Sequence, residues 1–219
     1  MSHRLTIAHV IWVVALVAAG CAQGDRPAAE YDARTGRLRR LAYDATGNGR
    51  NNAVSFMDGT RIHRIELDLD ENGRVERWDF YDANRTLEKV GLSRLNDGIM
   101  DSQAFYGPDG TVHRIEISTR RDGRFDRIEY YTRGTLVRGE EDTDHDGRID
   151  RWHSYRPNPE AAAHEPAFAI AATAFDDLGR GTPQRRFVYG GNGQVVRVEF
   201  DPDGDGVYER SEPRGAPPE

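Results

Sequence analysis

Residues 62–81 read IHRIELDLDENGRVERWDFY, and this arrangement of two alternating segments around an acidic, glycine-containing turn recurs along the chain. Residues 112–131 (VHRIEISTRRDGRFDRIEYY) and 136–155 (LVRGEEDTDHDGRIDRWHSY) match it nearly position by position. The turn glycines lie 24, 25, 25, 24, 34 and 25 residues apart. A fixed interval of this kind is typical of a repeat protein, in which one structural unit is copied along the chain. The glycines are Gly49, Gly73, Gly98, Gly123, Gly147, Gly181 and Gly206.

Each repeat predicts a β-hairpin. In the first segment an aliphatic residue is followed two positions later by a basic one, as in Ile62 and Arg64, and in the second an acid-arginine pair precedes aromatic residues. Alternation with period two, interrupted by glycine-rich turns, is the signal of antiparallel strands joined as hairpins. The sequence therefore predicts an all-β fold: an antiparallel meander of about fourteen strands, built from seven hairpin repeats of 24 to 25 residues.

Alternation also assigns side chains to the two faces of a sheet. For the unit at 62–81 we expect one apolar face and one charged face. Because an apolar face must be buried, we expect the meander to curl or to pack on itself, unless that face binds a partner. The expected apolar residues are Ile65, Leu67, Trp78 and Phe80, and the expected charged residues are Arg64, Glu66, Arg77 and Asp79.

The composition is polar, with 37% hydrophobic and 31% charged residues among 219 and a formal net charge of −7. Such a low content of aliphatic residues is typical of a disordered chain. Acidic and basic residues nearly balance, however, so electrostatic repulsion within the chain is mild. A meander with one solvated face needs fewer apolar residues than a globular core. Because basic residues alternate with acidic ones, we do not expect a nucleic-acid surface.

The N-terminus has the layout of a secretion signal, with a basic start, an apolar run too short to span a bilayer permanently, and small residues ending at Gly20. Cys21, the only cysteine, follows directly. This end resembles the lipobox of bacterial lipoproteins, although Ala18 stands where the family usually has Leu. The resemblance implies lipid attachment at Cys21 and, with Ala22 next, sorting to the outer membrane, with the body facing the periplasm or the cell surface.

These features divide the chain into four expected segments. Residues 1–20 are a cleaved lipoprotein signal peptide and 21–30 a lipidated tether. Residues 31–211 form the β-hairpin repeat domain, and the long interval is explained by a proline- and alanine-rich insert at 156–169. Residues 212–219 are a disordered tail. The repeat resembles the YD repeats of Rhs-type shell proteins and is similar in size to MORN repeats, which implies the architecture only.

Three of the seven turns carry a full set of oxygen ligands at alternate positions. Carboxylates or amides at loop positions 1, 3 and 5, a glycine at 6 and an acid at 9 resemble the calcium loops of EF-hand-like and dockerin-like proteins. Position 12 departs from the EF-hand, so we expect weak Ca²⁺ binding. The candidate ligands are Asp68, Asp70, Asn72 and Glu76; Asp142, Asp144, Asp146 and Asp150; and Asp201, Asp203, Asp205 and Glu209.

The alternative is that these residues only form turns. Asp, Asn and Gly favour turns without any metal, and the other four loops lack ligand positions, so strand pairing does not depend on calcium. A turn does not, however, require three acidic residues at alternate positions, because these residues repel one another. The sequence leaves both interpretations open.

No convergent set of catalytic residues is found in the sequence, so we expect a non-enzymatic envelope protein whose repeat body is a binding or structural module. Its expected partners are the membrane, through the lipid anchor, and an envelope protein or polysaccharide. The alternative is a carbohydrate-binding or carbohydrate-processing accessory that uses exposed aromatic residues. Trp78 and Trp152, at equivalent repeat positions, are the candidates for stacking on sugars.

Overall fold

The structure is a computed structural model that describes residues 24–158 and 167–213. These residues form one antiparallel sheet of fifteen strands in the order of the sequence. No helix in the described ranges is long and apolar enough to cross a membrane. The strands are β1 (Ala28–Tyr31), β2 (Leu38–Tyr43), β3 (Ala53–Asp58), β4 (Arg61–Leu67), β5 (Arg77–Tyr81), β6 (Leu87–Leu92), β7 (Ser102–Tyr106), β8 (Val112–Ile117), β9 (Arg127–Thr132), β10 (Thr135–Glu141), β11 (Arg151–Pro157), β12 (Phe168–Phe175), β13 (Arg185–Tyr189), β14 (Val195–Phe200) and β15 (Arg210–Pro213).

The predicted all-β meander is confirmed, with one strand more than expected. The additional strand is β1, most of which falls in the segment 21–30 that we expected to be a tether. At the other end β15 reaches Pro213, two residues into the expected tail. The signal peptide and Cys21 lie outside the described residues, as do 159–166 of the insert and 214–219 of the tail.

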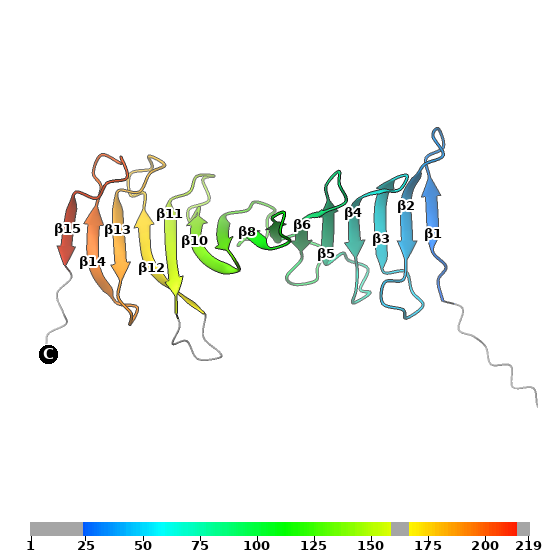
Figure 1. The fold of residues 1–219 in the computed structure, drawn as a ribbon, viewed down its shortest axis with the longest axis horizontal. Helices are drawn as coiled ribbons and strands as arrows, with labels where there is room; N and C mark the ends of the chain where they lie inside the picture. Colours follow the sequence, from blue (N-terminus) through cyan, green and yellow to red (C-terminus); the bar gives the residue numbers. More distant parts are fainter. Residues whose placement is uncertain (1–23, 159–166, 214–219) are drawn as a thin grey trace, which may run out of the picture.

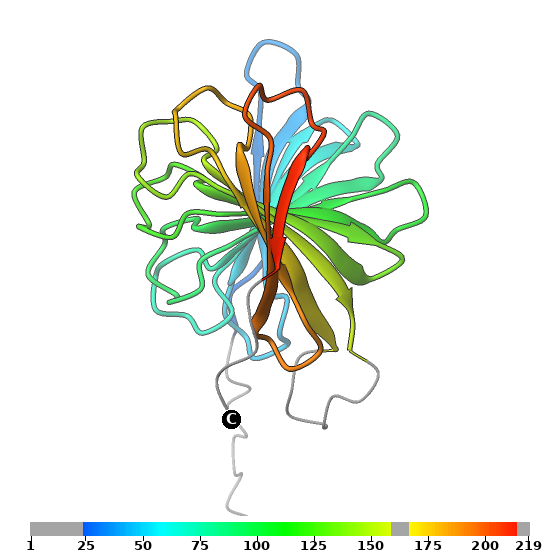
Figure 2. The same ribbon diagram turned by 90° about the vertical axis from the view of Figure 1, so that its left-hand side faces the viewer.

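Short turns and long loops alternate between the strands. At the short-turn ends the register shifts by one residue, for example between Phe56 and Met57 and between Phe80 and Tyr81. Such β-bulges increase the local right-handed twist of a sheet. Figure 1 shows the resulting long, narrow sheet, and the end-on view in Figure 2 shows its strands fanning out around a common axis.

The sheet is a single open layer, so the expectation that it curls or packs on itself is wrong. Among the strands of the described ranges, extensive contacts occur only between neighbours in sequence. Within the described residues, the buried hydrophobic residues are only Ala53, Val90, Leu136 and Ala174. The twist accumulates along the long axis of the sheet and does not bring distant repeats together, because each strand pairs with its neighbours in sequence.

The expected separation of an apolar from a charged face is also wrong. Arg64 pairs with Phe80, and Ile65 pairs with Asp79, and directly paired residues share one face. The cause is loop length, since the nine-residue loop 68–76 fixes the register between the two strands. A one-residue slip would reverse every side chain of one strand, and alternation within a strand does not reveal which register the loop selects.

Rows of interacting side chains cover both faces of the open sheet and take the place of a hydrophobic core. Arg64 lies over the ring of Phe56, 4.3 Å from its centroid, and Arg77 pairs with Asp79 at 2.6 Å on the opposite face. Exposed cation-π contacts contribute about 0.5–1 kcal/mol each and surface ion pairs about 0–1 kcal/mol, so many of them are needed. One row alternates cations and aromatic rings over nine strands: Arg40, Phe56, Arg64, Phe80, Lys89, Phe105, Arg114, Tyr130 and Arg138.

Candidate cation-binding loops

Seven nine-residue loops with a common conformation line one side of the sheet. The twist carries this side from the bottom of Figure 1, between β2 and β3, to the top, between β14 and β15. Positions 4 and 6 of every loop have φ values between 51° and 95°. At position 6 this explains the invariant glycine, which adopts positive φ without strain. The loops are 44–52, 68–76, 93–101, 118–126, 142–150, 176–184 and 201–209.

Side chains at positions 1 and 9 hold loop 142–150 in shape. Asp142 Oδ2 accepts a hydrogen bond from the backbone N–H of Gly147 at 2.8 Å, and Asp150 Oδ2 accepts one from that of Thr143 at 2.9 Å. The same position 1 contact recurs in loops that lack the full set of acids, for example between Asp176 and Gly181. Part of the acidic pattern is therefore turn chemistry, as the alternative interpretation requires.

Backbone hydrogen bonds join the loops into a continuous stack. The first N–H of each loop donates to the carbonyl of the last residue of the preceding loop, as from Asp142 to Asp126 at 2.8 Å and from Asp176 to Asp150 at 2.9 Å. The longer interval between the latter two loops is not accommodated in this stack, since both loops have nine residues and the extra length falls between the end of β11 and the start of β12. The residues before β1 cap the stack, since Asp25 N–H donates to Gly49 O at 2.5 Å.

The three predicted loops gather their acids into groups that could hold a cation. In each group one ligand atom per residue lies within 4.8 Å of all the others. Asp146 does not belong to the group of its loop. Its side chain accepts a hydrogen bond from the backbone N–H of Arg148, and Asn72, at the equivalent position, accepts one from the backbone N–H of Arg74. The grouped residues are Asp68, Asp70 and Glu76; Asp142, Asp144 and Asp150; and Asp201, Asp203, Asp205 and Glu209.

Two of the groups contain a buried carboxylate oxygen with no hydrogen-bond partner, Asp142 Oδ1 and Glu76 Oε2. Asp142 as a whole is only 9% exposed. An ionised oxygen buried without a partner costs free energy, and a hard cation such as Ca²⁺, which takes six to eight oxygen ligands, would satisfy it. These residues therefore fit a calcium ion, with backbone carbonyls or water completing its coordination.

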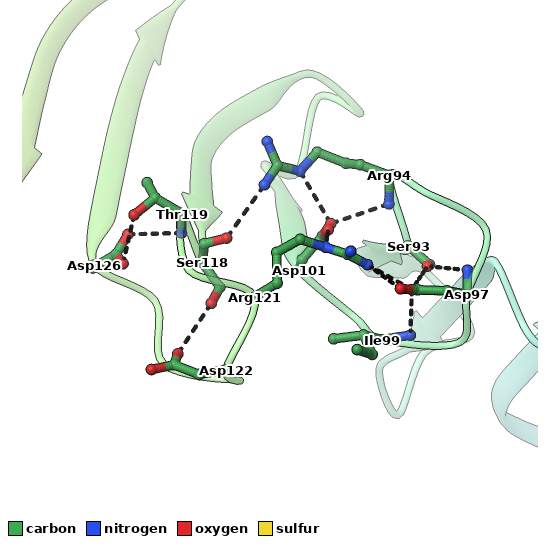
Figure 3. A network of polar contacts seen from close by, with 10 residues as sticks. All are labelled: Ser93, Arg94, Asp97, Ile99, Asp101, Ser118, Thr119, Arg121, Asp122 and Asp126. Carbon is green, nitrogen blue, oxygen red and sulfur yellow. Dashed lines mark hydrogen bonds and ion pairs between the residues drawn. The ribbon is translucent and has the colours of Figure 1, made fainter.

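The loop 93–101, one of the four without a full ligand set, binds an internal cation that sequence reasoning missed (Figure 3). Arg121, from the following loop, donates through Nη2 to both carboxylate oxygens of Asp97 at 2.6 Å and through Nε to Asp101 Oδ2 at 2.7 Å. Arg94 Nε donates to the other oxygen of Asp101 at 3.1 Å. The sequence signal for this contact is the basic residue 24 positions after Asp97. It can be recognised only when neighbouring loops are known to stack.

The arginines lower the pKa of both carboxyl groups. The hydrogen bonds from Arg121 are the main reason that the pKa of Asp97 falls to about 2. Asp101 is completely buried, and burial alone would raise its pKa. Hydrogen bonds from Arg121 and Arg94 outweigh that effect and hold the pKa of Asp101 below its usual value. Both groups are ionised at neutral pH.

The loop 118–126 shows a weaker form of the same arrangement. Asp126 is 6% exposed and accepts hydrogen bonds from the backbone and hydroxyl of Thr119, at 2.9 and 2.8 Å. His145 Nδ1, from the next loop, lies 3.3 Å from Asp126 Oδ2. The acids of this loop are again contacted from the following loop.

The two tryptophans lie on the same face of the sheet in half-buried positions. Trp78 pairs with Glu66, and Trp152 pairs with Glu140. Beside Trp152 is a shallow hollow of about 170 Å³, floored by Ala172 and Ala174 of β12. The other residues that line it are Arg138, His153, Ser154, Arg186 and Tyr208.

Comparison with known proteins leaves the family open. No family model matches the chain, and no curated protein matches it. Among solved structures, it is similar to a chain of the crystal structure of the GtfA/B complex, with a TM-score of 0.37 and 15% identity over 53% of this chain. The present chain spans 21% of that chain, and a likeness this distant carries no argument about function.

Proposed function

We propose that this protein is a non-catalytic, lipid-anchored envelope module whose stack of loops binds calcium ions at 68–76, 142–150 and 201–209. The observation that carries the proposal is the nearly buried Asp142, whose Oδ1 has no partner although it belongs to a group of acids within ligand distance. Glu76 Oε2 repeats the observation in a second loop. A purely turn-forming role would leave both oxygens without compensation.

The chemistry of such a site is electrostatic. Carboxylates at loop positions 1, 3 and 9 would bind the ion, and the ion would remove the repulsion between them. Because position 1 and position 9 begin and end the loop, an ion shared between them would hold adjacent strands together. The expected effect of calcium is therefore a more stable sheet rather than a reaction. The carboxylates recur at equivalent loop positions, which favours this role over acid-base catalysis.

Thermal unfolding with calcium or with a chelator tests this proposal. Asp142→Asn keeps one carbonyl oxygen for the Gly147 N–H and places an NH₂ group where a cation ligand is needed. The variant should lose part of the calcium-dependent rise in melting temperature. Asp176→Asn, the same change in a loop without the full ligand set, is the matched control and should keep the whole rise. An equal response to calcium in both variants would refute the site at 142–150.

The anchoring part of the proposal rests on the lipobox resemblance around Cys21. Durable attachment needs two or more acyl chains, because a single chain holds only marginally. Cys21→Ser should move the protein from the membrane fraction to the soluble fraction of its host. Retention of this variant with the membrane would refute the anchor and leave the calcium proposal untouched.

A second candidate function is carbohydrate binding, which the hollow beside Trp152 favours. Small alanines in front of an aromatic ring, with Arg138 and Arg186 at its border, provide a stacking surface and hydrogen-bond donors. Affinity electrophoresis in gels containing envelope polysaccharide tests it. Trp152→Ala should abolish retardation, while Phe105→Ala, an aromatic substitution outside the hollow, should not. Equal mobility of the wild type with and without polysaccharide would refute this function.

A further inference from the structure

The residue at loop position 4 contacts the preceding loop wherever its side chain is long enough. Arg121 binds Asp97 and Asp101 of the loop before it, and His145 lies beside Asp126. Asn96 Nδ2 lies 3.3 Å from Asp70 Oδ2. Glu71 follows the same rule, accepting hydrogen bonds from Asn48 and Arg50. All four have positive φ, which aims the side chain backward along the stack.

This contact distinguishes the acidic loops that we assign to calcium from those that we do not. The loops 93–101 and 118–126 receive a basic side chain, Arg121 and His145 respectively. The loop 68–76 receives the neutral Asn96, and 142–150 faces Gly179, which has no side chain. After 201–209 no further loop follows among the described residues. The three loops that retain all their acids thus receive no basic group from a following loop within the described residues. The loops 44–52 and 176–184, which are followed by Glu71 and Gly204 at position 4, receive none either, but they lack the acid at position 3.

We propose that the residue at position 4 of the following loop determines whether an acidic loop takes a divalent metal ion. This inference rests on the proposed calcium binding. In loop 93–101 the guanidinium of Arg121 holds the acids at positions 5 and 9, and position 9 is also a member of the group that we propose to bind calcium in loop 142–150. Position 4 is therefore a specificity-determining position that lies outside the ligand set of the loop it controls.

Competition for the same oxygens is the physical basis. Arg121 uses both oxygens of Asp97 and one of Asp101, and Arg94 uses the remaining oxygen. A cation attached to the protein is present at a high effective concentration. It neutralises the carboxylates that would attract an ion and occupies the oxygens that would coordinate it. In loop 142–150 no such group reaches Asp142, whose Oδ1 has no partner.

Gly179 can be replaced in a way that tests this rule. A Cβ added at this residue meets nothing within 4 Å, and its φ of 64° equals that of His145. The loops 142–150 and 176–184 stack like the others, since Asp176 N–H donates to Asp150 O at 2.9 Å. A long basic side chain at 179 is therefore placed like Arg121 relative to its preceding loop.

The experiment is calcium stoichiometry by equilibrium dialysis, using the full-length chain purified in detergent. Gly179→Arg should lower the number of bound calcium ions from three to two, although no ligand has been changed. Gly179→Asn also places a side chain on a residue with positive φ, but this side chain carries no charge. Like Asn96 beside loop 68–76, it should leave three ions bound. Asn96→Arg repeats the test at loop 68–76 and should also lower the number to two.

The outcomes separate the two proposals. Three ions on the wild type and on both arginine variants would overturn the role of position 4 and leave the calcium sites standing. Loss of an ion from Gly179→Asn as well as from Gly179→Arg would also overturn it, because charge would then not be the cause. Should Gly179→Arg not fold, Asn96→Arg decides the question. The absence of calcium binding by the wild type would overturn the proposed function itself.

Discussion

Arg121 shows how strongly one side chain depends on the loop next to it. Its guanidinium joins a half-buried carboxylate, Asp97, to a fully buried one, Asp101. A buried carboxylate that loses its partner is left with an uncompensated desolvation cost. The backbone of Arg121 has a φ of 58°, which is disfavoured for arginine, so this ion pair also compensates local strain.

Replacement of Arg121 by Gln should destabilise the protein. The variant keeps a polar side chain, which is shorter than that of arginine, and loses the charge that Asp97 and Asp101 share, so we expect the melting temperature to fall by several degrees. Arg120→Gln, a change at the exposed neighbouring residue, is the control and should change little. Differential scanning calorimetry measures both. Equal melting temperatures for the two variants would contradict the importance of the pair.

The contribution of Arg121 should disappear in acid. The pKa of Asp97 is lowered from 3.8 to about 2 in the folded protein. A carboxyl group with a depressed folded pKa stabilises the fold above its unfolded pKa and loses this effect as pH falls through the folded value. The difference in melting temperature between wild type and Arg121→Gln should thus be full at pH 6 and shrink as the pH falls from about 4 toward 2. A difference that is independent of pH would contradict the ion pair.

At the residue level, the sequence predicted which acids gather in each loop but not which side chains of the next loop contact them. Asp142 and Asp144 before the glycine and Asp150 three residues after it come together because the loop is short and its turn is tight. The pairing of Arg121 with Asp97 was not predictable from the local pattern, because it joins residues in different repeats. Knowledge of the stacking of loops was needed first.

At the level of the single element, the nine-residue loop determines the structure. Its two positions with positive φ reverse the chain, and its length sets which residues pair across the hairpin. Strands and turns were predictable because period two and the turn glycines repeat seven times. The placement of Arg64 and Phe80 on one face was not predictable. A slip of one residue leaves the alternation within each strand unchanged, and only the three-dimensional path of the loop selects the register.

Glycine at loop position 6 should be required for its backbone conformation rather than for space. Gly123 has a φ of 86°, and a Cβ built on it meets nothing within 4 Å. Gly123→Ala should cost about 1–2 kcal/mol of unfolding free energy, the usual cost of left-handed backbone in a residue with a Cβ. Gly191→Ala, where φ is not positive and space is also open, should be nearly neutral. Urea denaturation of both variants tests this, and equal midpoints would contradict the argument.

At the level of the whole molecule, repeated local contacts between neighbouring strands and loops stabilise the protein in place of a large hydrophobic core. Fifteen strands in one layer bury few apolar side chains, and backbone ladders, ion pairs and stacked loops connect each repeat to the next. Stability in such an array is a sum of local terms. The low hydrophobicity of the sequence correctly indicated a thin sheet. It did not indicate a single layer, because the prediction assumed an apolar face that needed covering, and the described sheet has no such face.

An open single layer should leave the tryptophans accessible. Trp78 and Trp152 are half-buried on a sheet without a covering layer. Acrylamide should therefore quench the tryptophan fluorescence of the folded protein substantially, and unfolding should increase quenching only moderately. Fluorescence that is blue-shifted and resistant to acrylamide would show that the rings lie in a closed core, in conflict with the open sheet.

The central claim is that three of the seven stacked loops bind calcium. Isothermal titration of the full-length chain with calcium, at an ionic strength that screens diffuse attraction to the acidic surface, tests it most directly. We predict saturable binding of three ions per chain, and of two after the substitution Asp142→Asn. Titration without saturable heat, together with an unchanged melting temperature, would contradict the claim and leave the acids of these loops as formers of turns.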